Sequence, residues 1–427
     1  MRNANERIVI TGFGCLSSVG ADLASTLESV KNGKSGIDRI SQWDATDWEF
    51  PYGAEIKDYD PKRMLTDRKL LKVLSRHDVI GLNSVSQALA HSQLLEYRDS
   101  LPDATFFNDR TGVYVGSPGI RFQQNYDFHS LMAQSQGDMK KFGTELFNYV
   151  SPMWLLKILP NNVLAYTGIQ NGFKGPNHNV ANHAVSGIQA MIECFYALKQ
   201  GIMDRALVVG YDAGVEPEGQ IYYGSLGALS RDGLRPFDAS HNGTILAEGA
   251  ATFVLETLSA AKERNATIYG EILAGATTNE ADGVFSIRED ADGLIRLFKQ
   301  VLERACLSPN DIGMIAAHGN GTVSSDSSEA LAIGEVFGNK QVPVTSYKWA
   351  LGHSLAAAGV LESLLSLQAL NEEQVPGIAN LEQVARTCDM ISVDAQPQST
   401  RSPMALIISR GFASLNTALI ISNYVPD

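Results

Sequence analysis

Short apolar runs rich in β-branched residues alternate with longer, helix-like stretches along the whole chain. In the first half the runs span residues 7–11, 112–115, 206–209 and 251–255, and in the second half they span 268–273, 314–316, 342–345, 405–408 and 418–421. This alternation predicts α/β layers built around largely buried strands. Because the two sets are similar in number and spacing, the sequence also favours an internal duplication, with the join at residues 258–265.

The composition excludes several classes of protein. With 34 basic and 47 acidic side chains the chain carries a formal charge of −13, which disfavours non-specific binding to nucleic acid or to an anionic membrane surface. No apolar run approaches the roughly twenty residues that span a bilayer, so we expect no membrane span. The four cysteines lie scattered without a metal-type spacing, and no signal-type segment precedes the first apolar run. We therefore expect a cytoplasmic protein without a metal site.

One segment combines a turn with the start of a helix. Residues 175–187 predict a turn, a short extended stretch and then a helix that ends near Gln200. Ala184 stands at the start of that helix. A helix N-terminus favours a thiolate and offers backbone N–H groups to an oxyanion, but the methyl group of an alanine can use neither.

Several further motifs follow one another at regular positions. They are 150–152 (Val-Ser-Pro), 175–177 (Gly-Pro-Asn), 185–187 (Val-Ser-Gly), 234–238 (Leu-Arg-Pro-Phe-Asp), 247–250 (Ala-Glu-Gly-Ala), 317–322 (Ala-His-Gly-Asn-Gly-Thr), Lys348 and 352–354 (Gly-His-Ser). Together they resemble the β-ketoacyl-acyl-carrier-protein synthases of the thiolase superfamily, across nearly the whole chain. The resemblance implies an α/β fold of the duplicated, five-layered αβαβα thiolase type. Residues 1–257 would form the N-terminal half and residues 258–427 the C-terminal half.

The first half is longer than a duplicated core requires. The extra sequence lies between residues 41 and 166 and includes an aromatic-rich stretch at 122–154. In families of this kind such insertions cap the site and build the dimer face. We therefore expect cap and dimer insertions in the N-terminal half.

The resemblance implies a nucleophilic cysteine where this chain has Ala184. His183 and Val185 also replace the small residues that normally flank the nucleophile, and they crowd the place where an acyl thioester would form. The chain is therefore similar to a chain length factor, a family member whose active-site cysteine is replaced by alanine.

The two histidines at family spacing, His318 and His353, match the pair that faces a malonyl thioester. By the same resemblance Lys348 orients the first histidine, and Asp326 and Glu329 stand at the acidic positions that accompany the lysine. Charges placed in this way would tune the protonation of the imidazoles. A plain ion pair between Lys348 and Glu329 is the alternative interpretation.

Other positions match the family in part. Thr322 would hydrogen-bond a phosphopantetheine arm, but Asn320 replaces its usual companion threonine. In the C-terminal loop Phe412, which would gate the acyl pocket, and Asn416 are kept. Between them the family's glycines and threonine are replaced by residues 413–415 (Ala-Ser-Leu). Replacing glycine costs backbone freedom wherever φ must be positive, so we expect the loop to be stiffer, or shaped differently, than in a working synthase.

A cluster of basic side chains lies early in the sequence, opposed only by Asp67. It consists of Lys62, Arg63, Arg68, Lys69 and Lys72. On one helix these side chains would form a face that meets an acidic acyl carrier protein. A plain solvated helix is the alternative.

Three interpretations of the function follow. The first is a chain-length-factor subunit in fatty acid or polyene-type polyketide assembly, paired with a catalytic ketosynthase as a heterodimer. The second is a condensing ketosynthase whose cysteine was changed to alanine by design. A heterodimer and a homodimer both remain open. The third is a malonyl-carrier-protein decarboxylase, because that step needs donors to an enolate but no acyl-enzyme. In each case we expect no permanently bound cofactor, and the phosphopantetheine arm of the carrier protein would bring the substrate.

Overall fold

Residues 6–121 and 126–426 are described by the structure, a computed structural model. Its main feature is a ten-stranded mixed sheet, made of two runs of five strands that meet at β1 and β8. The first run is, in spatial order, β5 (Asn177–Val180), β4 (Thr111–Gly116), β6 (Arg205–Ala213), β7 (Glu248–Thr257) and β1 (Ile8–Ser17). The second is β10 (Val344–Thr345), β9 (Met314–Ala316), β13 (Met404–Gly411), β14 (Leu415–Ser422) and β8 (Gly270–Asn279).

The two runs have the same topology. In the first, β4 is parallel to β5 and β6, whereas β7 is antiparallel to both β6 and β1. In the second, β9 is parallel to β10 and β13, whereas β14 is antiparallel to both β13 and β8. Only residues 8–10 of β1 and 270–272 of β8 join the runs. The repeat of strand order and direction agrees with the internal duplication inferred from the sequence. The boundary at residue 257 stays a prediction.

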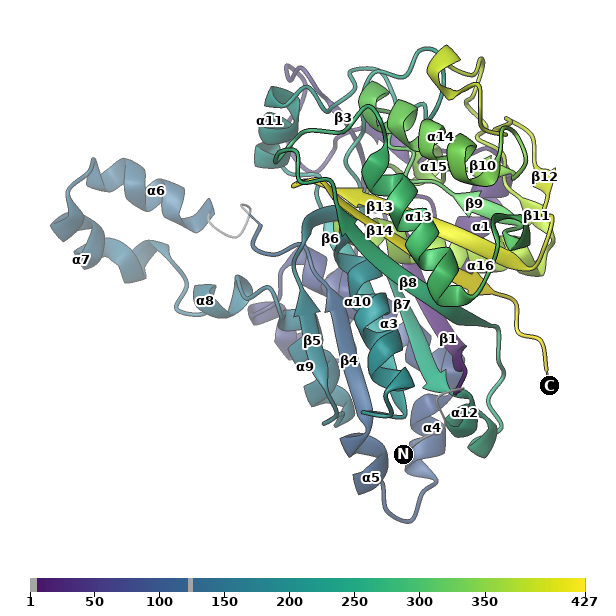
Figure 1. The fold of residues 1–427 in the computed structure, drawn as a ribbon. Coiled ribbons are helices and arrows are strands. Elements are labelled where there is room, and N and C mark those ends of the chain that lie inside the picture. The colour runs from purple at the N-terminus through teal and green to yellow at the C-terminus, as the bar shows by residue number, and fades with distance from the viewer. Residues whose placement is uncertain (1–5, 122–125, 427) are drawn as a thin grey trace.

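Six helices pack around the two runs of strands, directly or through another helix. They are α3 (Arg76–Ser92), α9 (Asn162–Asn171), α10 (Ser186–Lys199), α13 (Asp292–Ala305), α14 (Val323–Phe337) and α16 (Ala358–Asn371). Two of them, α10 and α16, contact strands of both runs, so they form the central layer. α3 packs on the first run and α13 on the second, as outer layers (Figure 1). The predicted α/β thiolase fold is confirmed.

The remaining elements are short. The α-helices are α1 (Leu23–Lys31), α2 (Pro61–Met64), α4 (Leu94–Asp99), α5 (Thr105–Asp109), α6 (Tyr126–Ser135), α7 (Met139–Tyr149), α8 (Trp154–Lys157), α11 (Pro217–Ser225), α12 (Leu258–Glu263) and α15 (Lys348–Leu351). The 3-10 turns are η1 (Arg68–Lys72), η3 (His183–Val185), η4 (Pro309–Asp311), η5 (Leu355–Ala357) and η6 (Arg386–Cys388). Two small hairpins pair β2 (Ile37–Arg39) with β3 (Tyr52–Ala54) and β11 (Gln374–Val375) with β12 (Gln398–Ser399).

Helices α6, α7 and α8 form an arm that projects away from the body of the molecule (Figure 1). Large apolar side chains are exposed along it, among them Met139 at 72%, Phe147 at 77% and Leu155 at 60%. Of the aromatic-rich stretch singled out in the sequence, residues 122–125 lie outside the described residues. A cluster of exposed apolar side chains on this scale is typical of an interaction surface. No helix in the part of the chain that the structure describes is long and apolar enough to cross a membrane.

The two central helices approach each other closely through glycines. A Cβ on Gly187 of α10 would lie 2.6 Å from the carbonyl oxygen of Ala356, in η5 directly before α16, and 2.6 Å from Cγ2 of Val360 in α16. A Cβ on Gly359 of α16 would lie 2.4 Å from Cγ1 of Ile188 in α10. These distances are far below van der Waals contact, so this crossing requires glycine on each helix.

Gly187→Ala should therefore destabilise the protein by about 2 kcal/mol, because the added methyl group meets a backbone oxygen that cannot move aside. Gly143→Ala is the matched control: Gly143 is also helical, but a Cβ added there would have no atom of the described residues within 4 Å. The control should be neutral or should stabilise by up to about 1 kcal/mol, because alanine is the better helix former. Urea unfolding midpoints measure both effects. Equal stability of the two variants would contradict the close crossing.

Candidate functional site

The residues expected at the site meet around one cavity of about 170 Å³, between the two halves of the chain. Its lining combines residues near the start of α10, the segments after β9 and β10, and the β13–β14 loop. The predicted site residues in that lining are Ala184, His318, Asn320, Thr322, His353, Phe412 and Asn416. Lys348 and Glu329 do not line the cavity and lie fully buried behind it.

Ala184 lies in η3, directly before the first turn of the fourteen-residue helix α10. It is buried, and its carbonyl oxygen accepts a hydrogen bond from Oγ of Ser409 (2.9 Å). His183, the preceding residue, has a φ of +55°, which is rare for a residue with a side chain. The methyl group of Ala184 therefore faces the cavity from a helix N-terminus, the setting that the sequence predicted.

His318 is held in one tautomer by the backbone. Its Nδ1 accepts a hydrogen bond from the N–H of Arg410 (3.3 Å), which leaves Nε2 to carry the ring proton. Burial, and then the positive charge of Lys348, holds the pKa of His318 well below 6.5. The imidazole is therefore neutral at physiological pH and serves as a hydrogen-bond donor.

The ring of His353 lies edge-on to that of His318, with the ring centroids 5.1 Å apart. The backbone of His353 is fixed by two hydrogen bonds, from its own N–H to Ile245 (2.7 Å) and from Ala247 to its carbonyl (3.0 Å). Its Nδ1 is buried and has no hydrogen-bond partner among residues 6–121 and 126–426. Burial, and then Lys348, holds the pKa of this ring well below 6.5 as well. The site thus presents two neutral imidazoles to one cavity.

The partner of Lys348 differs from the expected one. Nζ of Lys348 donates to the carbonyl oxygen of His318 (2.6 Å) and to a carboxylate oxygen of Glu362 in α16. Glu329 instead accepts hydrogen bonds from the backbone N–H groups of His318 (2.7 Å) and Gly319 (2.9 Å). The ion pair between Lys348 and Glu329 considered from the sequence is therefore wrong. Lys348 and Glu329 therefore both hold the backbone of His318, through its carbonyl oxygen and its N–H group.

Burial dominates the electrostatics of these acidic groups. It raises the pKa of Glu362 to about 7, although the adjacent Lys348 ammonium group acts in the opposite direction. It also raises the pKa of Glu329, against the two N–H donors and Arg410. Asp326, the other acidic position, accepts from the N–H of Phe237 (2.8 Å) and from Nδ1 of His241 (3.0 Å) rather than from Lys348.

The loop after β13 holds two residues other than glycine in a conformation that favours glycine. Ala413 and Ser414 have φ values of +61° and +60°, in the left-handed region. For residues with a Cβ this conformation costs roughly 1 kcal/mol each. The loop is held by the N–H of Ala413, which donates to Val284 (2.6 Å), and by Oγ of Ser414, which donates to Gly283 (2.6 Å).

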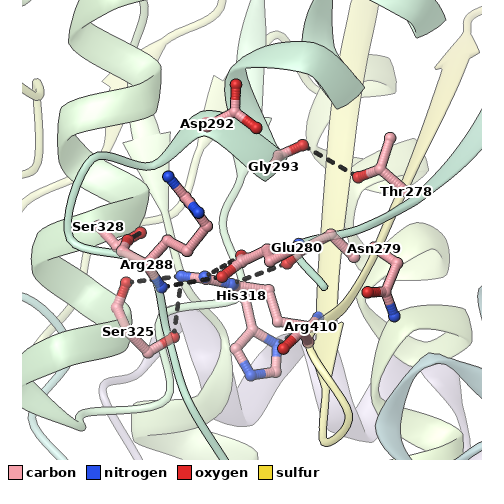
Figure 2. Close-up of polar contacts among 12 residues, drawn as sticks. Thr278, Asn279, Glu280, Arg288, Asp292, Gly293, His318, Ser325, Ser328 and Arg410 are labelled. Carbon is pink, nitrogen blue, oxygen red and sulfur yellow. Dashed lines mark hydrogen bonds and ion pairs between the residues drawn. The ribbon is translucent and has the colours of Figure 1, made fainter. Parts of the chain in front are cut away.

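A buried arginine connects this loop to its neighbours (Figure 2). Arg410 is 6% exposed, and its guanidinium group donates to Glu280 (2.9 Å), to Asn416 Oδ1 (3.0 Å) and to the Ser325 carbonyl (3.0 Å). Glu280 also accepts from Asn416 (2.9 Å) and from the N–H of Arg288 (2.9 Å). Asn416 therefore holds Arg410 and Glu280 in place.

The segment expected to hold a pantetheine arm is internally hydrogen-bonded. Oδ1 of Asn320 accepts from both the hydroxyl (2.8 Å) and the N–H (3.0 Å) of Thr322. This leaves the amide nitrogen of Asn320 and the hydroxyl oxygen of Thr322 to meet a ligand.

The basic cluster does not lie on one helix. Lys62 and Arg63 belong to α2, whereas Arg68, Lys69 and Lys72 belong to η1. All five side chains are exposed. Arg63 forms an ion pair with Asp60 (2.7 Å), and Nε of Arg68 donates to the carbonyl of Lys62 (3.0 Å). The cluster is thus a basic surface built from two short elements.

Three residues of the site were missed in the sequence. Glu362 carries a signal that could have found it, because it is the only charged residue in the otherwise apolar helix α16. Arg410 stands beside the predicted loop but has no local motif of its own. Tyr223 lines the cavity from α11, and nothing near it in the sequence marks it.

Comparison with known proteins gives a consistent result. The family model "Beta-ketoacyl synthase, N-terminal domain" matches residues 5–261, and "Beta-ketoacyl synthase, C-terminal domain" matches residues 269–382. The 3-oxoacyl-[acyl-carrier-protein] synthase 2 of Coxiella burnetii is 30% identical, and the protein of the same name from Synechocystis sp. is 29% identical. Each alignment covers 98% of both chains. A solved structure described as "The ishigamide ketosynthase/chain length factor" superimposes with a TM-score of 0.87 at 25% identity, over 98% of this chain and 100% of that one.

The pairing of Lys348 with Glu362 can be tested by double-mutant cycles at pH 8. Lys348→Met and Glu362→Gln should each destabilise the protein by about 3–5 kcal/mol, because each leaves a buried group without its partner. The double variant should be destabilised by less than the sum of the two single variants. Urea unfolding should give a coupling energy of at least about 1 kcal/mol. The cycle of Lys348→Met with Glu329→Gln should give a smaller coupling. A larger coupling there would mean that the pairing is assigned wrongly.

The depressed pKa of His353 predicts a dependence of stability on pH. The unfolded chain takes up a proton at this ring near pH 6.5, whereas the folded protein does so only at much lower pH. The stability that His353 contributes is therefore complete above pH 6.5 and is lost as the pH falls toward the folded pKa. Well below pH 6.5, the free energy of unfolding should fall with decreasing pH less steeply in His353→Gln than in the parent. The difference should be about 1.4 kcal/mol per pH unit. Urea unfolding at pH 7.5, 5.5 and 4.5 checks this, and parallel pH profiles would contradict it.

Proposed function

Because this chain belongs to the β-ketoacyl synthase family, we propose that it is a non-condensing subunit of the chain-length-factor type. It would pair with a cysteine-bearing ketosynthase in fatty acid or polyketide biosynthesis. The observation that carries the proposal is Ala184, the residue that faces the cavity from the N-terminus of α10.

The chemistry of condensation explains why this one residue matters. In a condensing synthase a thiolate attacks the acyl thioester, a new sulfur–carbon bond forms, and the carrier thiol leaves. The enolate made by loss of carbon dioxide from malonyl then attacks that acyl group. Ala184 has no sulfur, so this chain cannot hold the acyl group covalently.

Two further features support a diverged subunit over a synthase with one altered residue. His183 places a ring beside Ala184, and its centroid lies 4.4 Å from that of Phe412. Ala413 and Ser414 hold left-handed conformations that glycine would adopt without strain. A single replacement of the nucleophile would explain neither feature.

The arm formed by α6, α7 and α8 supports a dimer. Exposed apolar side chains like those of the arm are usually buried against a partner. In addition β5, the last strand of the sheet, has a free edge beside the arm. We propose that a ketosynthase subunit covers this surface. One relative in structure is described as a ketosynthase/chain length factor, which agrees with such a pairing. A homodimer is the alternative.

The carrier protein would meet the exposed basic cluster at residues 62–72. This surface would steer an acidic partner, and the arm of the carrier would reach the cavity past Asn320 and Thr322. Both residues line the cavity and have hydrogen-bonding groups left for an amide or a carbonyl of the arm.

A second candidate function rests on the intact pair His318 and His353. If malonyl-carrier protein enters the cavity, the bond to the carboxylate carbon breaks and carbon dioxide leaves. The electron pair passes to the thioester oxygen, where the neutral imidazoles donate hydrogen bonds. A proton from water then completes the acetyl group. This decarboxylation needs no thiol.

Intact-protein mass spectrometry after mixing with acyl- and malonyl-carrier protein tests the proposal. The parent chain should remain unmodified, because it has no nucleophile in the cavity. Ala184→Cys should take up no long acyl chain and should extend none by itself, because the ring of His183 beside position 184 obstructs the transfer of a long acyl chain. Chain extension should appear only when a cysteine-bearing synthase is added.

Ala184→Ser is the matched control, since it adds similar volume without a thiolate. Acylation of Ala184→Cys, followed by extension without a second synthase, would overturn the subunit proposal and favour a condensing enzyme. Conversion of malonyl- to acetyl-carrier protein by the parent chain alone would establish the decarboxylase.

A further inference from the structure

The wall of the cavity beside Ala184 is made by two hydrogen-bonded rings. His183 and Tyr223 both line the cavity, and Nε2 of His183 is hydrogen-bonded to the Tyr223 hydroxyl. The ring planes are 30° apart, with centroids separated by 5.8 Å. The wall next to Ala184 is therefore a fixed polar pair.

A third ring holds this pair in place. Phe412 stacks on His183 with a centroid distance of 4.4 Å and on Tyr223 with a distance of 5.4 Å. The backbone of His183 is fixed as well, because its carbonyl accepts from Oγ of Ser186 (2.6 Å). The rings cannot turn aside without breaking both the stack and the hydrogen bond.

A buried ion cluster lies close to the rings. Arg121 pairs with Asp212, and its NH1 lies 3.8 Å from a carboxylate oxygen of Glu216. The carboxylate side chains are 1% and 2% exposed. The charges of Arg121 and Asp212 act on both rings, and that of Glu216 acts on Tyr223. Both rings line the cavity, whereas the three charged residues do not, so buried charges lie close to this part of the cavity wall.

Both rings are uncharged at neutral pH. Burial, and then the positive charge of Arg121, lowers the pKa of His183 to about 4, and burial raises the pKa of Tyr223. Their hydrogen bond thus joins two neutral groups. An alkyl chain that entered here would have to break that bond and bring apolar surface against buried charges, which is unfavourable on both counts.

We propose that His183 and Tyr223 are specificity-determining residues that close the cavity beside Ala184 to acyl groups with an extended alkyl chain. The site then takes a short acyl group on a pantetheine-type arm, and a longer chain must lie in the partner subunit. The binding of a pantetheine-type arm rests on the proposed function. The exclusion of long alkyl chains rests on the ring contacts.

The test uses Ala184→Cys/Cys306→Ser as the parent, since Cys306 is the exposed cysteine of the described chain. The probes are amides of 2-bromopropanoic and 2-bromooctanoic acid with aminopantetheine, in which an amine replaces the thiol of pantetheine. In each reaction the introduced thiolate forms a sulfur–carbon bond at C2, bromide leaves, and the thiol proton passes to buffer. The probes share the arm and the secondary bromide and differ only in a methyl or a hexyl group. With the arm in the entrance, the methyl or hexyl group extends from C2 into the cavity, of which His183 and Tyr223 form the wall beside position 184.

In the parent, the short probe should alkylate position 184 at least tenfold faster than the long probe, as followed by peptide mass spectrometry. Adding His183→Gly should reduce this ratio to within about twofold of the ratio for free cysteine. Glycine adopts the φ of +55° at this position freely, so this variant should fold. Tyr223→Phe, which removes only the hydroxyl group, should lower the ratio part of the way.

Tyr222→Phe is the matched control, because Tyr222 is 46% exposed on the same helix and should leave the ratio unchanged. Equal rates of the two probes in the parent, or an unchanged ratio after His183→Gly, would overturn the proposal. The matching amides without the pantetheine arm serve as a reference. If neither probe reacts faster than its reference amide in any variant, the chain has no site for the arm, and the proposed function is contradicted as well. If the short probe reacts faster than its reference but the long probe reacts equally fast, only the exclusion of long chains is contradicted.

Discussion

The close crossing of α10 and α16 is the constraint on which the rest of the site depends. Gly187 and Gly359 let the two helices approach to a distance that any larger residue would prevent. The turns that precede them, η3 and η5, then lie in contact with each other, and η3 also contacts β13. Ala184 and the β13–β14 loop are therefore brought together by helix packing, with residues from both halves of the chain around one cavity.

Burial, more than any single charge, sets the chemistry of this cavity. Removal from water keeps the imidazoles of His318, His353 and His183 neutral, and it raises the pKa of Glu329 and Glu362. The charges present act mainly on position. Lys348 holds the carbonyl of His318, and Arg410 ties the loop to Glu280. Such a site can donate hydrogen bonds to a developing enolate, but by itself it offers no nucleophile.

The departures from a condensing site lie in two segments. Ala184 and His183 belong to the turn before α10, and Ala413 and Ser414 belong to the β13–β14 loop. His318, in contrast, has a defined tautomer, and the backbone of His353 is fixed by two hydrogen bonds. The nucleophile is therefore missing from a cavity that still contains the two histidines.

The sequence by itself determined the α/β layering, the approximate strand positions and the identity of several cavity residues. These follow from local patterns, because apolar runs and motifs such as Gly-His-Ser are contiguous in the chain. The sequence also indicated that Ala413 and Ser414 replace glycine in the β13–β14 loop, where the structure gives both residues a positive φ. Tertiary structure decided which groups became partners. Lys348 pairs with Glu362 rather than Glu329, and the basic residues 62–72 occupy two short elements instead of one helix. It also decided that Tyr223 is hydrogen-bonded to His183 in the cavity wall beside Ala184. These contacts join segments far apart in the chain, and their geometry is set by the packing of helices and strands, which no local pattern encodes.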